Sequence, residues 1–67
     1  SQRETVVLSA AASGLTNKAI GQRLSISEQT VKAHMKSLMA KLGARDRTHA
    51  VTIALQRGII SLERIAL

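Results

Sequence analysis

The chain has 67 residues with no cysteine and no proline, which excludes a disulfide framework and a thiolate metal site and favours one small all-helical domain. Ten Lys and Arg residues against four Asp and Glu residues give a formal net charge of +6, which favours nucleic acid as a partner. Aromatic side chains for stacking single strands are absent, as is any apolar run that could span a membrane, so we expect a cytoplasmic protein that binds double-stranded DNA.

The first predicted helix covers residues 2–13. Ser1 and Glu4 have the spacing of a capping box, and Gly14 is placed to end the helix in the left-handed conformation. The apolar residues follow the three-and-four spacing of one buried face: Val7, Leu8, Ala11 and Leu15. Because a capping box rarely coincides with a natural start and the chain lacks an initiator methionine, we expect a fragment of a longer protein whose sensory part is missing.

The next two predicted helices flank a tight turn. Thr16 can cap a short second helix, which ends where Ser25-Ile26-Ser27 interrupts the apolar pattern. Ser27 then caps a third helix that begins at Glu28 and is ended by Gly43. The apolar stripe of this third helix consists of Val31, Met35, Leu38 and Leu42.

The apolar residues around this turn have the offsets of a helix-turn-helix. They are Ile20, Leu24, Ile26, Val31 and Leu38. Gly21 costs about 1 kcal/mol of helix propensity relative to alanine, which favours a close approach of the third helix at this point. The alternative is that Gly21 has no packing role and is simply an unfavourable residue within the helix.

The face of the third helix opposite its apolar stripe is basic and carries short side chains between lysines. Its members are Gln29, Lys32, Ala33, Lys36 and Ser37. Lysine can donate to guanine acceptors, and an alanine methyl group can contact thymine. An ordinary solvated helix face is the alternative, but the second helix of the motif is the one that enters the major groove.

A fourth helix is predicted over residues 47–57, with Asp46 as its cap and Gly58 as its stop. Its apolar residues span about 200° of the helix; they are Ala50, Val51, Ile53, Ala54 and Leu55. A single buried face needs only about half of this arc. The additional apolar surface predicts contact with a partner copy, unless the alanine methyl groups are simply exposed. For the segment from Ile59 to Leu67, a further helical turn capped by Ser61 and a frayed end remain open.

The two histidines have no cysteine or clustered carboxylate to complete a metal site or a catalytic dyad, so we expect no enzyme activity and no cofactor. His34 lies between the apolar stripe and the basic face. We expect its ring to be packed with one nitrogen hydrogen-bonded, with a phosphate contact as the alternative. His49 is expected to be a solvated surface residue.

Residues along nearly the whole chain also match, in register, the pattern of a known family. They are Arg3-Glu4, Gly14-Leu15-Thr16-Asn17-Lys18, Ile20, Leu24, Ile26-Ser27-Glu28, Thr30-Val31-Lys32, His34, Lys41-Leu42-Gly43, Arg47, Ala50-Val51, Ala54 and Gly58-Ile59-Ile60. With these residues the chain resembles the LuxR-type, or NarL/FixJ-like, output domain of bacterial transcription regulators. It departs from the family at Ala19, where glutamate is usual, and at Gly21, where alanine is usual; neither belongs to the groove-facing set.

The resemblance implies that residues 1–67 form a compact four-helix domain that contains a helix-turn-helix and regulates transcription. It would be the output domain of a response regulator of a two-component system, or of a ligand-responsive regulator. The implied base contacts are Lys32, Ala33, Lys36 and Ser37. The implied phosphate contacts are Asn17, Lys18, Ser27, Thr30, Lys41, Arg45, Arg47 and Thr48.

The resemblance also implies a homodimer on DNA through the fourth helix, with Ala50, Val51, Ala54 and Leu55 at the interface. RNA polymerase is a further candidate partner, and neither a metal ion nor a membrane partner is implied. Two other functions remain open. One is a basic amphipathic module that lies on an anionic membrane or an acidic protein, although the Trp and Phe anchors of such modules are lacking. The other is a protein-interaction module in which the fourth helix has the main role.

Overall fold

The computed structural model describes residues 2–61, which form four helices and no strand. The helices are α1 (Gln2–Ala12), α2 (Asn17–Leu24), α3 (Glu28–Leu42) and α4 (Arg47–Gln56). The predicted all-α class and the order of the elements are confirmed. The predicted first and fourth helices are each one residue too long at the carboxyl end. Ser1, the predicted cap of α1, and the segment after Ser61 lie outside the described residues.

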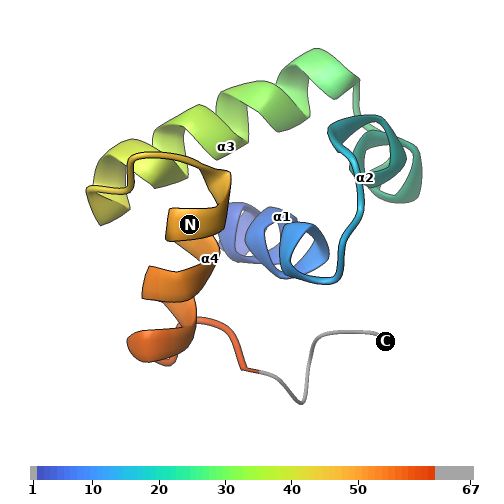
Figure 1. Ribbon diagram of the computed structural model, residues 1–67. Coiled ribbons are helices and arrows are strands. Elements are labelled where there is room, and N and C mark those ends of the chain that lie inside the picture. Colours follow the sequence, from blue (N-terminus) through green and yellow to red (C-terminus); the bar gives the residue numbers. More distant parts are fainter. Residues whose placement is uncertain (1, 62–67) are drawn as a thin grey trace.

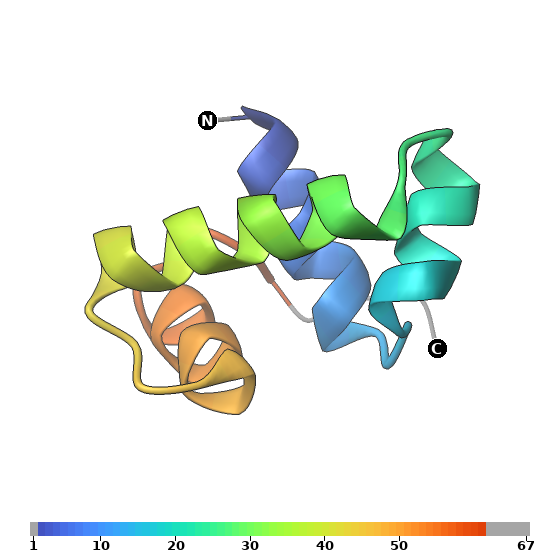
Figure 2. The ribbon, with the colours of Figure 1, turned by 90° about the horizontal axis from the view of Figure 1, so that it is seen from above.

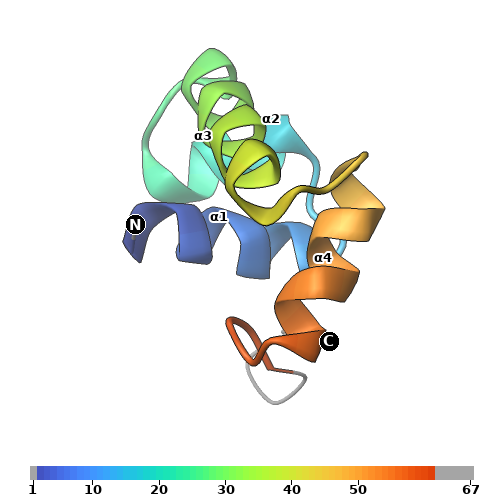
Figure 3. The same cartoon turned by 90° about the vertical axis from the view of Figure 1, so that its left-hand side faces the viewer.

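The longest helix, α3, lies across the other three and contacts each of them (Figure 1). Seen from above, α2 lies at the amino end of α3, α4 lies at its carboxyl end, and α1 crosses beneath its middle (Figure 2). The view along α3 shows it resting on α1 (Figure 3). No other described helix passes over the outer side of α3, so this side is left to solvent or to a partner (Figure 2).

Local hydrogen bonds set where three of the helices begin. The hydroxyls of Thr16 and Ser27 and the carboxylate of Asp46 each accept from a backbone N–H three residues later, at 3.1, 3.0 and 2.8 Å. Each bond satisfies an N–H that has no partner within its helix. The three predicted caps are therefore confirmed.

The turn between α2 and α3 is closed by backbone that approaches Gly21. Ser25 ends α2 in the left-handed conformation, with φ of 59°, and the Ile26 N–H donates to the Gly21 carbonyl at 2.9 Å. A Cβ atom on Gly21 would lie 2.7 Å from the Ile26 carbonyl oxygen and 3.3 Å from the Glu28 nitrogen. Close packing at Gly21 is thus confirmed, but the turn and the first residue of α3 make the approach, rather than the body of that helix.

The apolar core is formed by the inner faces of all four helices and by Ile60, which follows α4. Its buried members are Val7, Leu8, Ala11, Ile20, Val31, Met35, Leu38, Ala50, Ala54 and Ile60. The predicted stripes of the first and third helices therefore face inward, although Leu15 and Leu42 are only partly buried against the core. Ile60 is 4% exposed, so the chain after α4 returns to the core, a contact that the sequence pattern had left open.

Candidate nucleic-acid interface

The outer side of α3 carries most of the side chains that the sequence predicts to reach bases. Lys32, Ala33 and Lys36 are exposed on this helix, as is Gln29, whereas the stripe residues on its other side are buried. Because no other described helix covers this side, α3 can approach a DNA duplex without rearrangement (Figure 2). We call Gln29, Lys32, Ala33 and Lys36 the outer basic face.

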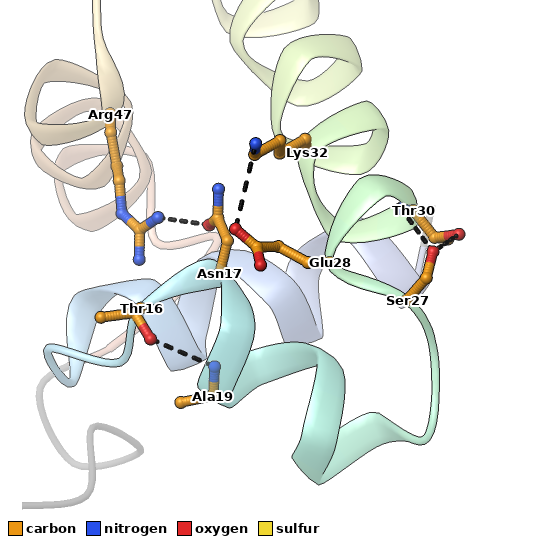
Figure 4. Close-up of polar contacts among 8 residues, drawn as sticks. All are labelled: Thr16, Asn17, Ala19, Ser27, Glu28, Thr30, Lys32 and Arg47. Carbon is orange, nitrogen blue, oxygen red and sulfur yellow. Dashed lines mark hydrogen bonds and ion pairs between the residues drawn. The ribbon is translucent and has the colours of Figure 1, made fainter.

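One carboxylate lies at the edge of the outer basic face. Glu28 begins α3, and its Oε2 atom lies 3.9 Å from the Nζ atom of Lys32, with side chains 48% and 56% exposed (Figure 4). An exposed pair of this spacing contributes only about 0.3–0.5 kcal/mol. Lys32 can therefore exchange this partner for a base or a phosphate. Over residues 2–61, Lys36 has no acidic side chain within ion-pair distance.

Ser37 is placed differently from the other predicted base contacts. It is only partly exposed, and its hydroxyl hydrogen-bonds the Glu4 carboxylate of α1. Ser37 therefore lies where α3 meets α1, at the border of the outer basic face. Its predicted contact with a base stays a prediction, and the outer basic face is defined without it.

The same Glu4 carboxylate pairs with Lys41, which was expected to contact phosphate. The Lys41 Nζ atom donates to Glu4 Oε1 at 2.9 Å, and the side chains are 60% and 12% exposed, respectively. The hydrogen bonds from Lys41 and Ser37 lower the pKa of Glu4 to about 2. The structure thus gives Lys41 an intramolecular role, as a link between α3 and α1. The spacing of Glu4 predicts a capping box and gives no sign of this link to a residue 37 positions away.

Two further predicted phosphate contacts, Arg47 and Asn17, bind each other. Arg47 begins α4 and is partly buried, and its guanidinium donates to the Oδ1 atom of Asn17 and to the carbonyl oxygen of Leu15 (Figure 4). The planar guanidinium thereby ties the start of α4 to the start of α2. The partners lie 30 positions apart, so helix periodicity could not have revealed the contact.

The remaining predicted phosphate contacts are all exposed: Lys18, Ser27, Thr30, Arg45 and Thr48. Ser27 and Thr30 lie at the start of α3, with their hydroxyl oxygens 2.8 Å apart (Figure 4). Lys18 follows Asn17 in the first turn of α2. In the part of the chain that the structure describes, neither Lys18 nor Arg45 forms an ion pair. Their positions allow phosphate contact, which remains a prediction.

The two histidines are both partly buried, which was expected of His34 but not of His49. His34 is partly buried, as expected, but no hydrogen bond among residues 2–61 reaches its ring, so the expected bond is not found within the described chain. His49 was expected to be solvated and is instead partly buried. Its Nδ1 atom accepts from the Arg45 N–H at 3.0 Å, which fastens the loop that precedes α4.

The predicted dimer surface on α4 needs correction. Ala50 and Ala54 are 0% exposed within the chain's own core, so they cannot face a partner copy in this fold. Val51 and Leu55 are partly buried and pack against the same core. The wide apolar arc of α4 is explained by α1, α3 and Ile60, which all pack against the helix within one chain.

Metal-ligand clusters and membrane-spanning helices were both sought in the described part of the chain. Among residues 2–61, no group of three or more His, Asp or Glu side chains gathers where it could hold a metal ion. None of the four helices has the length and hydropathy that crossing a bilayer requires.

Comparison with known proteins gives matches over most of the chain. Residues 1–54 match the family described as "Bacterial regulatory proteins, luxR family".

The chain is 50% identical over 62 residues to the transcriptional regulatory protein YdfI of Bacillus subtilis, covering 92% of this chain and 29% of YdfI. It is 48% identical over 56 residues to the nitrate/nitrite response regulator protein NarP of Escherichia coli, covering 84% and 26%. Identity to the transcriptional regulatory protein FixJ of Rhizobium meliloti is 47% over 58 residues, covering 87% and 28%. The chain therefore spans less than a third of each of these relatives, and no solved structure matches it.

Proposed function

The chain belongs to the luxR family of bacterial regulatory proteins, and we propose that it binds double-stranded DNA in a sequence-specific manner as the output domain of a transcriptional regulator. The observation that carries this proposal is the outer basic face. It lies on the second helix of a helix-turn-helix, which is the helix that enters the major groove in this motif. The family is one of regulatory proteins, and we assign the domain no enzymatic reaction.

The proposed binding mode divides the contacts between the two helices of the motif. Lys32 and Lys36 of α3 would donate to guanine O6 and N7 atoms, and the Ala33 methyl group would contact thymine. Lys18 of α2 and the hydroxyl of Thr30 would bind phosphates on either side of the groove. Phosphate contacts set the register of the helix, and base contacts select the sequence.

For a regulator of the length of YdfI or NarP, we propose that this domain works in the cytoplasm beside a receiver or ligand-sensing domain. Two copies would bind paired half-sites, which supplies the avidity that one small face lacks. A dimer through α4 would use the partly exposed Val51 and Leu55 with the exposed Thr52, rather than Ala50 and Ala54. RNA polymerase is a candidate partner of the assembled regulator.

Selection of bound oligonucleotides from a random duplex pool tests the proposal. We expect enrichment of one motif that contains two related half-sites, because direct contacts from α3 discriminate among base pairs. Recovery of duplexes without a common motif would contradict sequence-specific binding, and failure to retain any duplex at moderate salt would contradict DNA binding altogether.

A further inference from the structure

We propose that Arg47 is a positioning residue that turns the side-chain amide of Asn17 so that its nitrogen donates to a DNA phosphate. The inference rests on the proposed DNA binding, and it concerns how one phosphate contact is prepared. Its basis is the contact between the start of α4 and the start of α2, in which the Arg47 guanidinium donates to both Asn17 Oδ1 and the Leu15 carbonyl oxygen (Figure 4).

The chemistry of the amide gives this contact its direction. An asparagine side chain carries an accepting oxygen at one end and two donor N–H groups at the other. Because Arg47 has no acceptor, only the oxygen of Asn17 can face it, and the nitrogen must face away. Figure 4 shows the Asn17 nitrogen turned away from the guanidinium. Without Arg47, either end of the amide could face outward, and an outward oxygen would repel a phosphate.

The position of Asn17 makes a phosphate the natural acceptor. Asn17 begins α2 and is followed by the exposed Lys18, and the close-up shows it on the same side of the motif as Glu28 and Lys32 of α3 (Figure 4). Nothing within residues 2–61 accepts a hydrogen bond from its Nδ2 atom. A free, oriented donor at the edge of the outer basic face matches the neutral side chains that commonly bind phosphate oxygens.

A direct phosphate contact by Arg47 itself is the competing account, and it predicts a different salt dependence. Each phosphate neutralised by a cationic side chain adds about 0.9 to the slope of log affinity against log salt concentration, whereas a neutral amide releases no counterion. Arg47 is partly buried, and its guanidinium is bound to oxygens of Leu15 and Asn17. We therefore expect its removal to weaken binding without changing the slope.

The first experiment measures affinity for a short mixed-sequence duplex over a series of salt concentrations, with Asn17→Ala, Arg47→Met and the double variant of the chain. Circular dichroism is used first to find a temperature at which every variant is folded. Each single substitution should lower affinity by about threefold to tenfold, as the loss of one neutral hydrogen bond does. The double variant should lose no more than either single one. Lys18→Ala is the control, and it should lower the slope by about 1.

A second variant keeps the interhelix contact and removes only the donor. Asn17→Asp still accepts from Arg47, now as an ion pair, so unfolding in urea should occur at no lower concentration than in the wild type. It presents a second oxygen outward, so affinity for the duplex should fall at least as far as in Asn17→Ala. This variant tests the inference even if Arg47→Met does not fold.

Three results would overturn the inference: unchanged affinity in Asn17→Asp, additive losses in the double variant, or a smaller salt slope in Arg47→Met. The first would mean that the contact only holds the helices together, and the other two would mean that Arg47 binds phosphate directly. The proposed function fails separately, if the wild-type chain does not bind the duplex or if Lys18→Ala leaves both its affinity and its salt slope unchanged.

Discussion

The cationic side chains of this domain differ between its outer basic face and the junctions between its helices. On the outer basic face, Lys36 is exposed without an ion pair over residues 2–61, and Lys32 lies 3.9 Å from a single exposed carboxylate. At the junctions, Lys41 binds Glu4 of α1, and Arg47 binds oxygens at the start of α2. The net charge of +6 therefore overstates how many cations are free to meet DNA, since part of it serves the fold.

The two groups should respond to substitution in opposite ways. A hydrated lysine on the outer basic face contributes little to folding, and it gains its best partner only when DNA binds. A partly buried arginine already has its partners, so its removal leaves acceptors unsatisfied in the free protein. We expect substitutions at the junctions to lower stability and substitutions on the outer basic face to lower affinity.

The largest expected effect on stability comes from the tight turn between α2 and α3, which packs against Gly21. Gly21→Val should destabilise the domain by roughly 3 kcal/mol, because its Cβ would lie 2.7 Å from the Ile26 carbonyl oxygen. Ala40→Val, on an exposed position of α3, is the matched control and should cost less than about 1 kcal/mol. Urea unfolding followed by circular dichroism measures both. Equal losses of stability in the two variants would show that the turn is not tightly packed against Gly21.

Arg47→Met sharpens the comparison at the junction of α2 and α4. We expect a loss of about 2 kcal/mol in the free energy of unfolding, because the Leu15 carbonyl and Asn17 lose their donors. Arg45→Met is the matched control, since Arg45 is exposed and forms no ion pair among residues 2–61, and its cost should stay within about 0.5 kcal/mol. Chemical unfolding of the two variants measures both losses. Equal losses of unfolding free energy would show that the contacts of Arg47 do not stabilise the fold.

The Glu4–Lys41 junction predicts a specific dependence of stability on pH. The pKa of Glu4 is lowered from 4.5 to about 2, chiefly by the hydrogen bond from Lys41. A carboxylate whose pKa is lower in the folded state stabilises the fold above its unfolded pKa, and this contribution is lost as pH falls through the folded value. The melting temperature of the wild type should therefore drop between pH 4.5 and about 2.

Glu4→Gln should flatten that part of the pH profile, and at neutral pH it should melt below the wild type. Glu28→Gln, which alters an exposed carboxylate at the start of α3, is the control and should keep the acid dependence of the wild type. If Glu4→Gln retained the full acid dependence, the link between α1 and α3 would not be the source of the effect.

The smallest expected effect concerns the single carboxylate beside the outer basic face. Glu28→Gln removes the partner of Lys32 and one negative charge, so affinity for a mixed-sequence duplex should rise about twofold. Its stability should change by less than about 0.5 kcal/mol. Fluorescence anisotropy at low salt can resolve such a change, and a fall in affinity would show instead that Glu28 itself assists binding.

The helices were predictable from the sequence because each one depends on residues within four positions of one another. Thr16, Ser27 and Asp46 act on N–H groups three residues away, and periodicity alone separates the buried Val31 from the exposed Lys32. The outer basic face follows from the same local rule. Its border does not, because whether Ser37 belongs to it depends on where α1 crosses.

The parts that could not be predicted join residues far apart in the chain. Neither spacing nor composition relates Arg47 to Asn17, so two cooperating residues were predicted as two independent phosphate contacts. Two residues of the predicted dimer surface were misplaced for the same reason: Ala50 and Ala54 look like surplus apolar surface until the packing of α1 and Ile60 against α4 is known. Tertiary packing decides which polar and apolar groups remain available.

The most direct test of the outer basic face compares Lys36→Ala with Lys18→Ala on a selected duplex and on versions of it with single base changes. Lys36→Ala should lower affinity for the selected duplex by about tenfold and weaken the preference for the base that Lys36 contacts. Lys18→Ala should weaken binding about equally on every sequence and leave that preference intact. If the Lys36→Ala protein kept the wild-type affinity and preference, α3 would not read bases through its outer basic face.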